Sequence, residues 1–218
     1  MTTETVKRRP GRPSQSEQSP VDDEACLDRA LEAFAERGYE GASLREIATA
    51  CGISHGLLNA RFGSKQGLWT AAVEQGMDRL HHRMVTLQTR LPKSAGLDQR
   101  LHAACVDFLE TLAAYPAIIQ LMNIEGSRNS ARLDYIVETF FRNREWPVAS
   151  LLEEGRDSGL FRPVHIAVPF TLLAHGAGAL VALRPLVEAV DERLSNEPEA
   201  QSRLITSAAD LIVRGLRA

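Results

Sequence analysis

The side chains best suited to chemistry in this sequence lie between His55 and Arg61, where they could read the edges of nucleic-acid bases. Asparagine can hydrogen-bond adenine N6 and N7 together, and arginine can bond guanine O6 and N7. Asn59 and Arg61 are of these types, and Leu57 could pack on a thymine methyl group. The alternative is that Asn59 is a polar surface residue and that Arg61 only clamps a phosphate.

A short helix would bring these side chains together on one surface. At 100° per residue, Leu58 and Phe62 define its inward face, and Gly56 and Ala60 lie nearly opposite. Two small residues there would let the helix sit deep in the major groove, which admits an α-helix. The side chains flanking that contact are then His55 with Asn59 on one side, and Leu57 with Arg61 on the other.

A second short helix and a tight turn would position this one. Ser43 and Glu46 have the spacing of a capping box, which predicts a helix start. Gly52 ends that helix and supplies the turn, and Ser54 can cap the next helix. This order predicts a helix-turn-helix, although helical hairpins of ordinary proteins can imitate the spacing.

Further helices flank this pair. Ser19-Pro20 predicts the start of a preceding helix, and Gly38 predicts its end. Ser64 can cap a long following helix, whose apolar face runs from Leu68 to Leu91. The remaining helices are expected at about 97–114, 116–126, 131–157, 165–190 and 200–216.

The predicted fold class is therefore all-α, with about nine helices. A three-helix helix-turn-helix head would precede a larger C-terminal helical bundle. The expected division is a disordered basic arm at 1–19, a helix-turn-helix DNA-binding domain at 20–66, and a helical body at 67–218. Gly176 and Gly178 fall inside one predicted helix, where close approach of another helix would be one reason for them.

Charge and composition exclude several classes of protein. The net charge of −3 over 218 residues argues against a uniformly basic coat protein, so a DNA site must be a local patch. Residues 43–65 hold three basic side chains and one acidic one. No phosphate loop, paired catalytic carboxylates or metal-ligand cluster supports an enzyme or a metal protein.

Cysteine usage and the ends of the chain predict a cytoplasmic protein. Cys26, Cys51 and Cys105 are expected to be reduced core residues. Pro10 and Pro13 interrupt the start of the chain where a signal peptide needs an apolar run. The uncharged stretch 166–183 is read as a buried helix instead of a membrane span.

Residues 43–64 closely resemble the DNA-binding head of the TetR family of bacterial regulators. The resemblance covers roughly Ala25 to Val73 and follows the order of the elements as well as the motif. The matching pieces are Phe34-Ala35-Glu36-Arg37-Gly38-Tyr39, Ser43-Leu44-Arg45-Glu46-Ile47-Ala48, Gly52-Ile53-Ser54-x-Gly56-x-Leu58 and Phe62-x-Ser64-Lys65.

This resemblance implies a homodimer that binds double-stranded DNA at a palindromic operator and is released by a small, mostly apolar effector. An activator, or a DNA-binding protein without a ligand, remains the alternative. The resemblance implies that residues 67–218 form a ligand-binding and dimerisation domain, with dimerisation through helices at about 165–190 and 200–216 and with no cofactor. The candidate DNA contacts are Ser43, Arg45, Ser54, His55, Gly56, Leu57, Asn59, Arg61 and Lys65.

Two further sets of residues are candidates for binding. Arg9 and Arg12 lie in a basic, proline-rich arm that could enter the minor groove or could be a solubilising tail. A ligand pocket could use Phe108, Met122, Glu125, Trp146, Phe170 and His175, although such residues are commonly just core. The chain departs from the family at Asn59, Ala60 and Arg61, where aromatic or histidine residues are usual.

Overall fold

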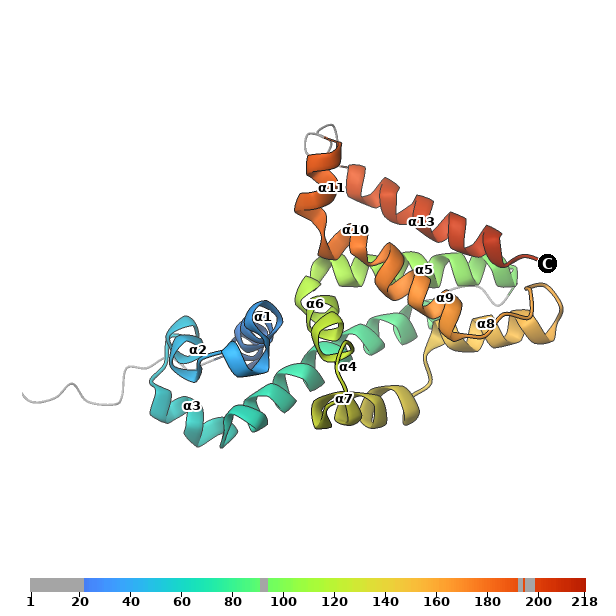
Figure 1. Cartoon of the computed structure of the whole chain (residues 1–218). Helices are drawn as coiled ribbons and strands as arrows, with labels where there is room; N and C mark the ends of the chain where they lie inside the picture. The colour runs from blue at the N-terminus through green and yellow to red at the C-terminus, as the bar shows by residue number, and fades with distance from the viewer. Residues whose placement is uncertain (1–21, 91–93, 192–193, 195–198) are drawn as a thin grey trace, which may run out of the picture.

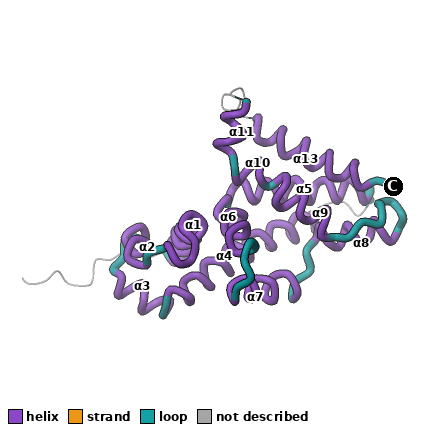
Figure 2. Tube along the Cα trace, in the orientation of Figure 1, coloured by secondary structure: helices purple, strands orange, loops and turns teal. Residues whose placement is uncertain are grey.

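The chain folds into a small helical head and a larger helical body, joined by one long helix (Figure 1). The computed structural model describes residues 22–90, 94–191, 194 and 199–218. Within these ranges every named element is a helix, and the one extended pairing is an isolated bridge between Phe161 and Arg217. Figure 2 accordingly shows helix and loop throughout. The all-α prediction is confirmed.

The head consists of α1 (Asp23–Gly41), α2 (Leu44–Ala50) and α3 (His55–Phe62). Asp22 caps α1 by accepting hydrogen bonds from the backbone of Glu24 and Ala25. The predicted start at Ser19-Pro20 lies outside the described residues, and the described helix begins at Asp23. Gly38 interrupts α1 with a φ of +69°, at the position where the sequence predicted the helix to end.

The long helix α4 (Lys65–Arg90) packs against both α1 and α5, and so is shared by the head and the body. Ser64 caps it as predicted, accepting a hydrogen bond from the Gly67 amide at 3.0 Å. The apolar stripe of α4 is buried at Leu68, Trp69, Ala72, Val73, Met77, Leu80 and Met84. Leu91, the predicted end of this stripe, lies outside the described residues.

In the body, α5 packs against α4, α8 and α13, as well as against α6, η3 and α10 (Figure 1). The body contains two π-helical segments, η2 and η3, in addition to its α-helices. The elements are α5 (Leu97–Ala114), α6 (Pro116–Glu125), α7 (Ala131–Ile136), η2 (Val137–Arg142), α8 (Pro147–Asp157), α9 (Ala167–Thr171), η3 (Leu172–Ala177), α10 (Ala179–Ala182), α11 (Arg184–Val190) and α13 (Ala200–Leu216).

The predicted single helix over 131–157 is wrong, because the chain breaks between Arg142 and Pro147. Proline disfavours helical backbone in the residue before it and is well suited to the first turn of a new helix. The indole of Trp146 donates a hydrogen bond to the Phe140 carbonyl at 2.8 Å, and this bond links the residues on the two sides of the break. Trp146 is consequently 9% exposed instead of lying on a helix surface.

The predicted helix over 165–190 is also broken, into α9, η3, α10 and α11. The segments Ala167–Ala182 and Arg184–Val190 meet at 72°. A Cβ added at Gly178 would lie 1.9 Å from the Ala174 carbonyl oxygen but 3.5 Å from Leu112 of α5. The tight π turn therefore requires this glycine, and close approach of another helix is not the reason.

No described helix is by itself both long enough and apolar enough to cross a membrane. Two bent pairs reach that length and composition only when their helices are added together: Leu97–Ala114 with Pro116–Glu125, and Ala167–Ala182 with Arg184–Val190.

Candidate nucleic-acid interface and ligand cavity

Helix α3 is held by a tight turn and a side-chain cap, as the sequence predicted. Gly52 has a φ of +69°, a conformation that glycine adopts at little cost. The next amide, of Ile53, donates to the Ala48 carbonyl at 3.0 Å. Ser54 accepts a hydrogen bond from the Leu57 amide at 3.1 Å. Leu58 is 1% exposed, so it fixes α3 against the head core.

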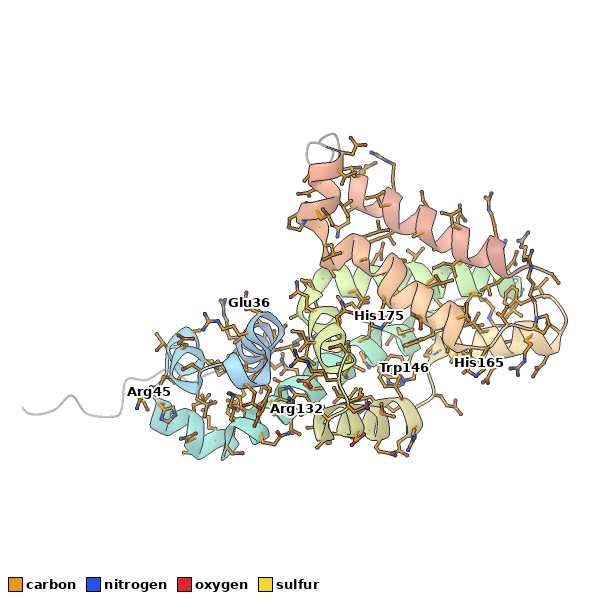
Figure 3. The ribbon with its side chains drawn as sticks, in the orientation of Figure 1. Glu36, Arg45, Arg132, Trp146, His165 and His175 are labelled. Carbon is orange, nitrogen blue, oxygen red and sulfur yellow. A yellow bond between two sulfur atoms is a disulfide. The ribbon has the colours of Figure 1, made fainter. Side chains whose placement is uncertain are left out.

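The opposite face of α3 is open to solvent. His55, Gly56 and Ala60 are exposed, and Asn59 and Leu57 are half-buried. Arg45 is exposed on α2, and Figure 3 shows it at the outer end of the head, away from the body. This surface combines small residues with hydrogen-bonding side chains, which is the composition that groove recognition requires.

The two cations at the far end of α3 are engaged within the head. Arg61 forms an ion pair with Asp23 at the start of α1. The Lys65 ammonium donates to the Glu40 carbonyl at 3.1 Å and lies 4.9 Å from the centre of the Tyr39 ring. A phosphate reaching either cation must therefore compete with a partner inside the protein.

The predicted capping box at Ser43 and Glu46 is wrong. Ser43 occupies the N-cap position of α2, but its side chain makes no capping hydrogen bond. Glu46 instead pairs with Arg37 of α1. A contact with a neighbouring helix has thus displaced the local one.

Acidic side chains cover the outer surface of α1. Glu36 lies on a different side of the head from Arg45 (Figure 3). The exposed acids of this helix and its cap are Asp22, Asp23, Glu24, Glu32, Glu36 and Glu40. Such a distribution suits a helix that faces away from DNA, because acidic side chains repel phosphates.

The structure corrects the prediction that all three cysteines are reduced. Cys26 of α1 and Cys51 at the end of α2 form a disulfide, with their Cα atoms 5.1 Å apart. That separation is within the range that a disulfide spans. Cys105 is the remaining free cysteine of the described residues, and it is buried in α5.

The body encloses a mostly apolar cavity of about 320 Å³. Five of the six side chains predicted for a pocket meet there. Its wall comes from α4, α5, α6, α7, η2, the 143–146 break, α9 and η3. The lining residues are Met77, Leu80, Phe108, Leu112, Ile118, Ile119, Met122, Asn123, Gly126, Ser127, Leu133, Ile136, Phe141, Trp146, Phe170, Ala174 and His175.

Glu125 is the sixth predicted pocket residue, and it is not part of the wall. Its carboxylate is buried, with the side chain 5% exposed, and it pairs with Arg132 at 2.9 Å. A buried carboxylate needs such a partner because an unpaired charge is costly away from water. Glu125 therefore pairs with Arg132 beside the cavity and does not line it.

A polar pair stands at the rim of the cavity. His175 of η3 and Asn123 of α6 are both exposed, and Nδ1 of the histidine lies 2.6 Å from Oδ1 of the asparagine. This position excludes the alternative of His175 as a buried core histidine. Sequence reasoning missed Asn123, for which the available signal was a polar residue within the apolar helix 116–125.

An apolar surface extends over α9, η3, α11 and α13. These elements coincide with the two regions predicted for dimerisation. The exposed large apolar side chains there are Val168, Leu172, Leu183, Leu186, Val190 and Leu211. Among the described residues, no group of three or more His, Cys, Asp or Glu side chains could hold a metal ion. The arm residues Arg9 and Arg12 lie outside the part of the chain that the structure describes.

Comparison with known proteins identifies relatives of both the head and the whole fold. A profile described as bacterial regulatory proteins of the tetR family matches residues 27–72. The transcriptional repressor ComR of Escherichia coli K12 is 36% identical over 78 residues, which are 36% of this chain and 35% of ComR. The transcriptional repressor KstR2 of Mycobacterium tuberculosis is 27% identical over 139 residues, or 63% of this chain and 68% of KstR2.

Solved structures extend the likeness to nearly the whole chain. The structure of the ketosteroid transcriptional regulator KstR2 of M. tuberculosis has a TM-score of 0.67 at 20% identity, covering 92% of this chain and 97% of that one. The transcriptional regulator FadR of Bacillus subtilis, in complex with stearoyl-CoA, has a TM-score of 0.62 at 17% identity. That match covers 90% of this chain and all of FadR. At these identities the likeness shows the fold.

Proposed function

We propose that this chain is a transcriptional repressor of the TetR family of bacterial regulatory proteins, and that it binds an operator as a homodimer. The observation that carries the proposal is the exposed face of α3, which the Gly52 turn and the Ser54 cap hold out from the head. The relatives ComR and KstR2 are both named repressors. The proposed role includes no catalytic step. Binding to a chromosomal operator requires the bacterial cytoplasm, a compartment in which disulfides such as Cys26–Cys51 are uncommon.

The proposed DNA contacts are those predicted from the sequence. His55, Asn59 and Leu57 read base edges in the major groove, with Gly56 giving close approach. Arg61 leaves Asp23 for a phosphate. The remaining contacts, which position the head on the backbone, come from Ser43, Arg45, Ser54 and Lys65, with residues 20–66 acting as the DNA-binding unit.

Dimerisation is proposed through the apolar surface of α9, η3, α11 and α13. Leu172 and Leu211 are 55% and 75% exposed, respectively, and a monomer would leave both in water. A dimer would place two copies of α3 one DNA turn apart, about 34–36 Å. Leu211→Glu should produce a monomer in sedimentation, whereas Val85→Glu, at an exposed apolar residue of α4, should not. A wild-type monomer at micromolar concentration would refute this part of the proposal.

The effector is proposed to be a mostly apolar molecule with one polar group. Its apolar part would fill the cavity of the body, and its polar group would meet Asn123 and His175 at the rim. One structural relative is a ketosteroid regulator and the other binds stearoyl-CoA, and the large apolar part that ketosteroids share with a stearoyl chain supports a mostly apolar effector. Phe108, Met122, Trp146 and Phe170 supply the proposed apolar contacts.

The decisive experiment is selection of bound DNA from a random pool, followed by binding curves on the recovered sequence. A palindromic site with nanomolar affinity is expected. A reporter placed behind that site should be silenced by the protein, whereas activation would replace the repressor role with an activator role. Recovery of no preferred sequence would contradict the proposed function.

The effector proposal has a separate test. Stearoyl-CoA and androstenedione should be added to the protein on its selected operator, with release followed by fluorescence anisotropy. Trp146→Ala alters the cavity wall and should change the concentration needed for release. Failure of both probes would leave the operator result intact but would contradict an effector of these two chemistries.

The basic arm is proposed to add contacts in the minor groove. Its four positive charges within residues 7–13 would release counterions from DNA, so its removal should weaken binding and lower the salt dependence. A protein lacking residues 1–13 would test this on the selected operator. An unchanged affinity and salt slope would assign Arg9 and Arg12 to a tail that does not touch DNA.

A further inference from the structure

Tyr39, at the end of α1, lies against one cation from the head and one from the body. The Arg132 guanidinium of α7 is 4.3 Å from the centre of the tyrosine ring. The Lys65 ammonium, at the start of α4, is 4.9 Å from the same centre. Aromatic rings attract cations at these distances. One ring thus contacts both the body and the end of the head proposed to bind phosphate.

Arg132 cannot shift independently of the end of α6. Its Nε donates to both carboxylate oxygens of Glu125, at 2.9 and 3.1 Å. Glu125 is buried, and separating the pair would leave a charge without a partner away from water. Any displacement of Glu125 therefore carries Arg132, and with it the guanidinium against Tyr39.

The cavity wall includes residues on both sides of this ion pair. Asn123 and Gly126, which flank Glu125 in the sequence, line the cavity. Leu133, which follows Arg132, lines it as well. A molecule in the cavity would consequently press on the two segments that the ion pair joins. The labelled position of Arg132 at the junction of head and body agrees with this arrangement (Figure 3).

We propose that Tyr39 is the relay between the cavity and the DNA-binding surface, with the position of Arg132 on its ring setting how Lys65 is held. This inference rests on the proposed function and deepens it by naming the residues that couple the two sites. Both cations draw on the negative charge of one ring and also repel each other. A displacement of Arg132 changes the attraction between the ring and Lys65, and it also changes the repulsion between the two cations. Lys65 must be released from the ring to bind a phosphate.

Coupling between two binding sites is reciprocal, so it can be measured with operator DNA alone. In the wild-type protein, binding of the selected operator should change hydrogen exchange of the amides in residues 122–133 by about fivefold. Tyr39→Leu removes the ring and should abolish that change while the operator still binds. Tyr39→Phe keeps the ring and serves as the matched control, with the wild-type response expected.

A second variant covers the case in which Tyr39→Leu does not fold. The double substitution Glu125→Gln with Arg132→Gln removes the guanidinium from the ring without leaving an unpaired buried charge. It should bind the operator and show no change in exchange at residues 122–133. A merely structural role for Arg132 would alter stability but would leave the response to the operator in place.

The outcomes separate the relay from the function on which it rests. An operator that binds the wild type without altering exchange at residues 122–133 would overturn the relay alone. A Tyr39→Leu protein that responds to the operator as the wild type does would also overturn it. Failure to select any operator would remove both the relay and the proposed repressor.

Discussion

The head and the body are both helical, but the short helices of the head are regular and the long predicted helices of the body are interrupted. In the head, α2 and α3 begin directly after Ser43 and Ser54, where the sequence predicts helix starts, and the turn between them depends on Gly52. In the body, the two longest predicted helices are broken at 143–146 and near Leu183, and η2 and η3 are wound as π helices. The break at 143–146 and both π segments adjoin the cavity, where side chains such as Trp146 form the wall.

This difference teaches that regular helices and helix defects serve separate purposes here. A surface that reads base edges needs side chains fixed relative to one another, and closely packed regular helices provide this. A cavity requires missing contacts, and its lining loses the packing energy that a filled core would have. The head should therefore be sensitive to changes in packing, while the cavity wall should be tolerant of them.

The largest expected change in stability comes from removing one aromatic ring from each region. Phe34→Ala, in the head core where the side chain is 1% exposed, should lower the free energy of unfolding by about 3–5 kcal/mol. Phe170→Ala, on the cavity wall, should cost less because its ring already adjoins empty space. Urea denaturation of both variants would measure this, and an equal loss for the two would break the comparison.

The disulfide provides the next largest effect. Closing a loop between Cys26 and Cys51, 25 residues apart, should stabilise the head by about 3 kcal/mol through the entropy of the unfolded chain. Thermal unfolding with and without a reductant would show this as a lower melting temperature after reduction. Cys51→Ser should abolish the response to reductant, and Cys105→Ala should retain it. A melting temperature that is insensitive to reductant would contradict the prediction.

A smaller effect separates base reading from phosphate binding on α3. Asn59→Ala should cost about 1–3 kcal/mol at one base position of the operator, as for a lost bidentate contact. Arg61→Ala should weaken binding to all sequences about equally if it clamps a phosphate. Binding to the operator and its single-base variants would distinguish them. A uniform loss with Asn59→Ala, or none, would reject its role in base reading.

The smallest effect is expected at Cys105 of the body, whose thiol should not be alkylated in the folded protein. Burial raises the pKa of the Cys105 thiol to about 12. The reactive thiolate would then be about one part in ten thousand at pH 8, and the surrounding core blocks access. Iodoacetamide should label Cys105 only after unfolding, whereas the half-buried Cys51 should react in the reduced native head. Labelling of Cys105 in the native state, followed by mass spectrometry, would show a looser body than proposed.

Sequence reasoning succeeded where a feature depends on neighbouring residues. Ser54 and Ser64 cap the helices that follow them, since a cap needs only the next three residues. It failed where a partner comes from another element. Ser43 lost its reciprocal partner because Arg37 of α1 attracts Glu46, and no local pattern encodes that contact.

The same reason explains the cysteines and the cavity. The Cys26–Cys51 pair depends on how α1 crosses α2, which spacing along the chain does not define. Five pocket residues were predicted because large apolar and aromatic side chains are common in cavities, and Glu125 was misplaced because that composition says nothing about Arg132. The roles of these residues in binding DNA or a ligand stay predictions.

The acidic outer surface of α1 has a consequence for how quickly a productive complex can form. Glu36, one of the exposed acids of α1, lies on a different side of the head from Arg45, so the head has an electrical polarity. A polyanion approaching α1 is repelled, and one approaching α3 is attracted. Unproductive collisions are therefore short, and the molecule rotates toward its binding face before contact. A protein with a net charge of −3 can in this way associate with DNA rapidly, with most of the selection made by orientation during diffusion.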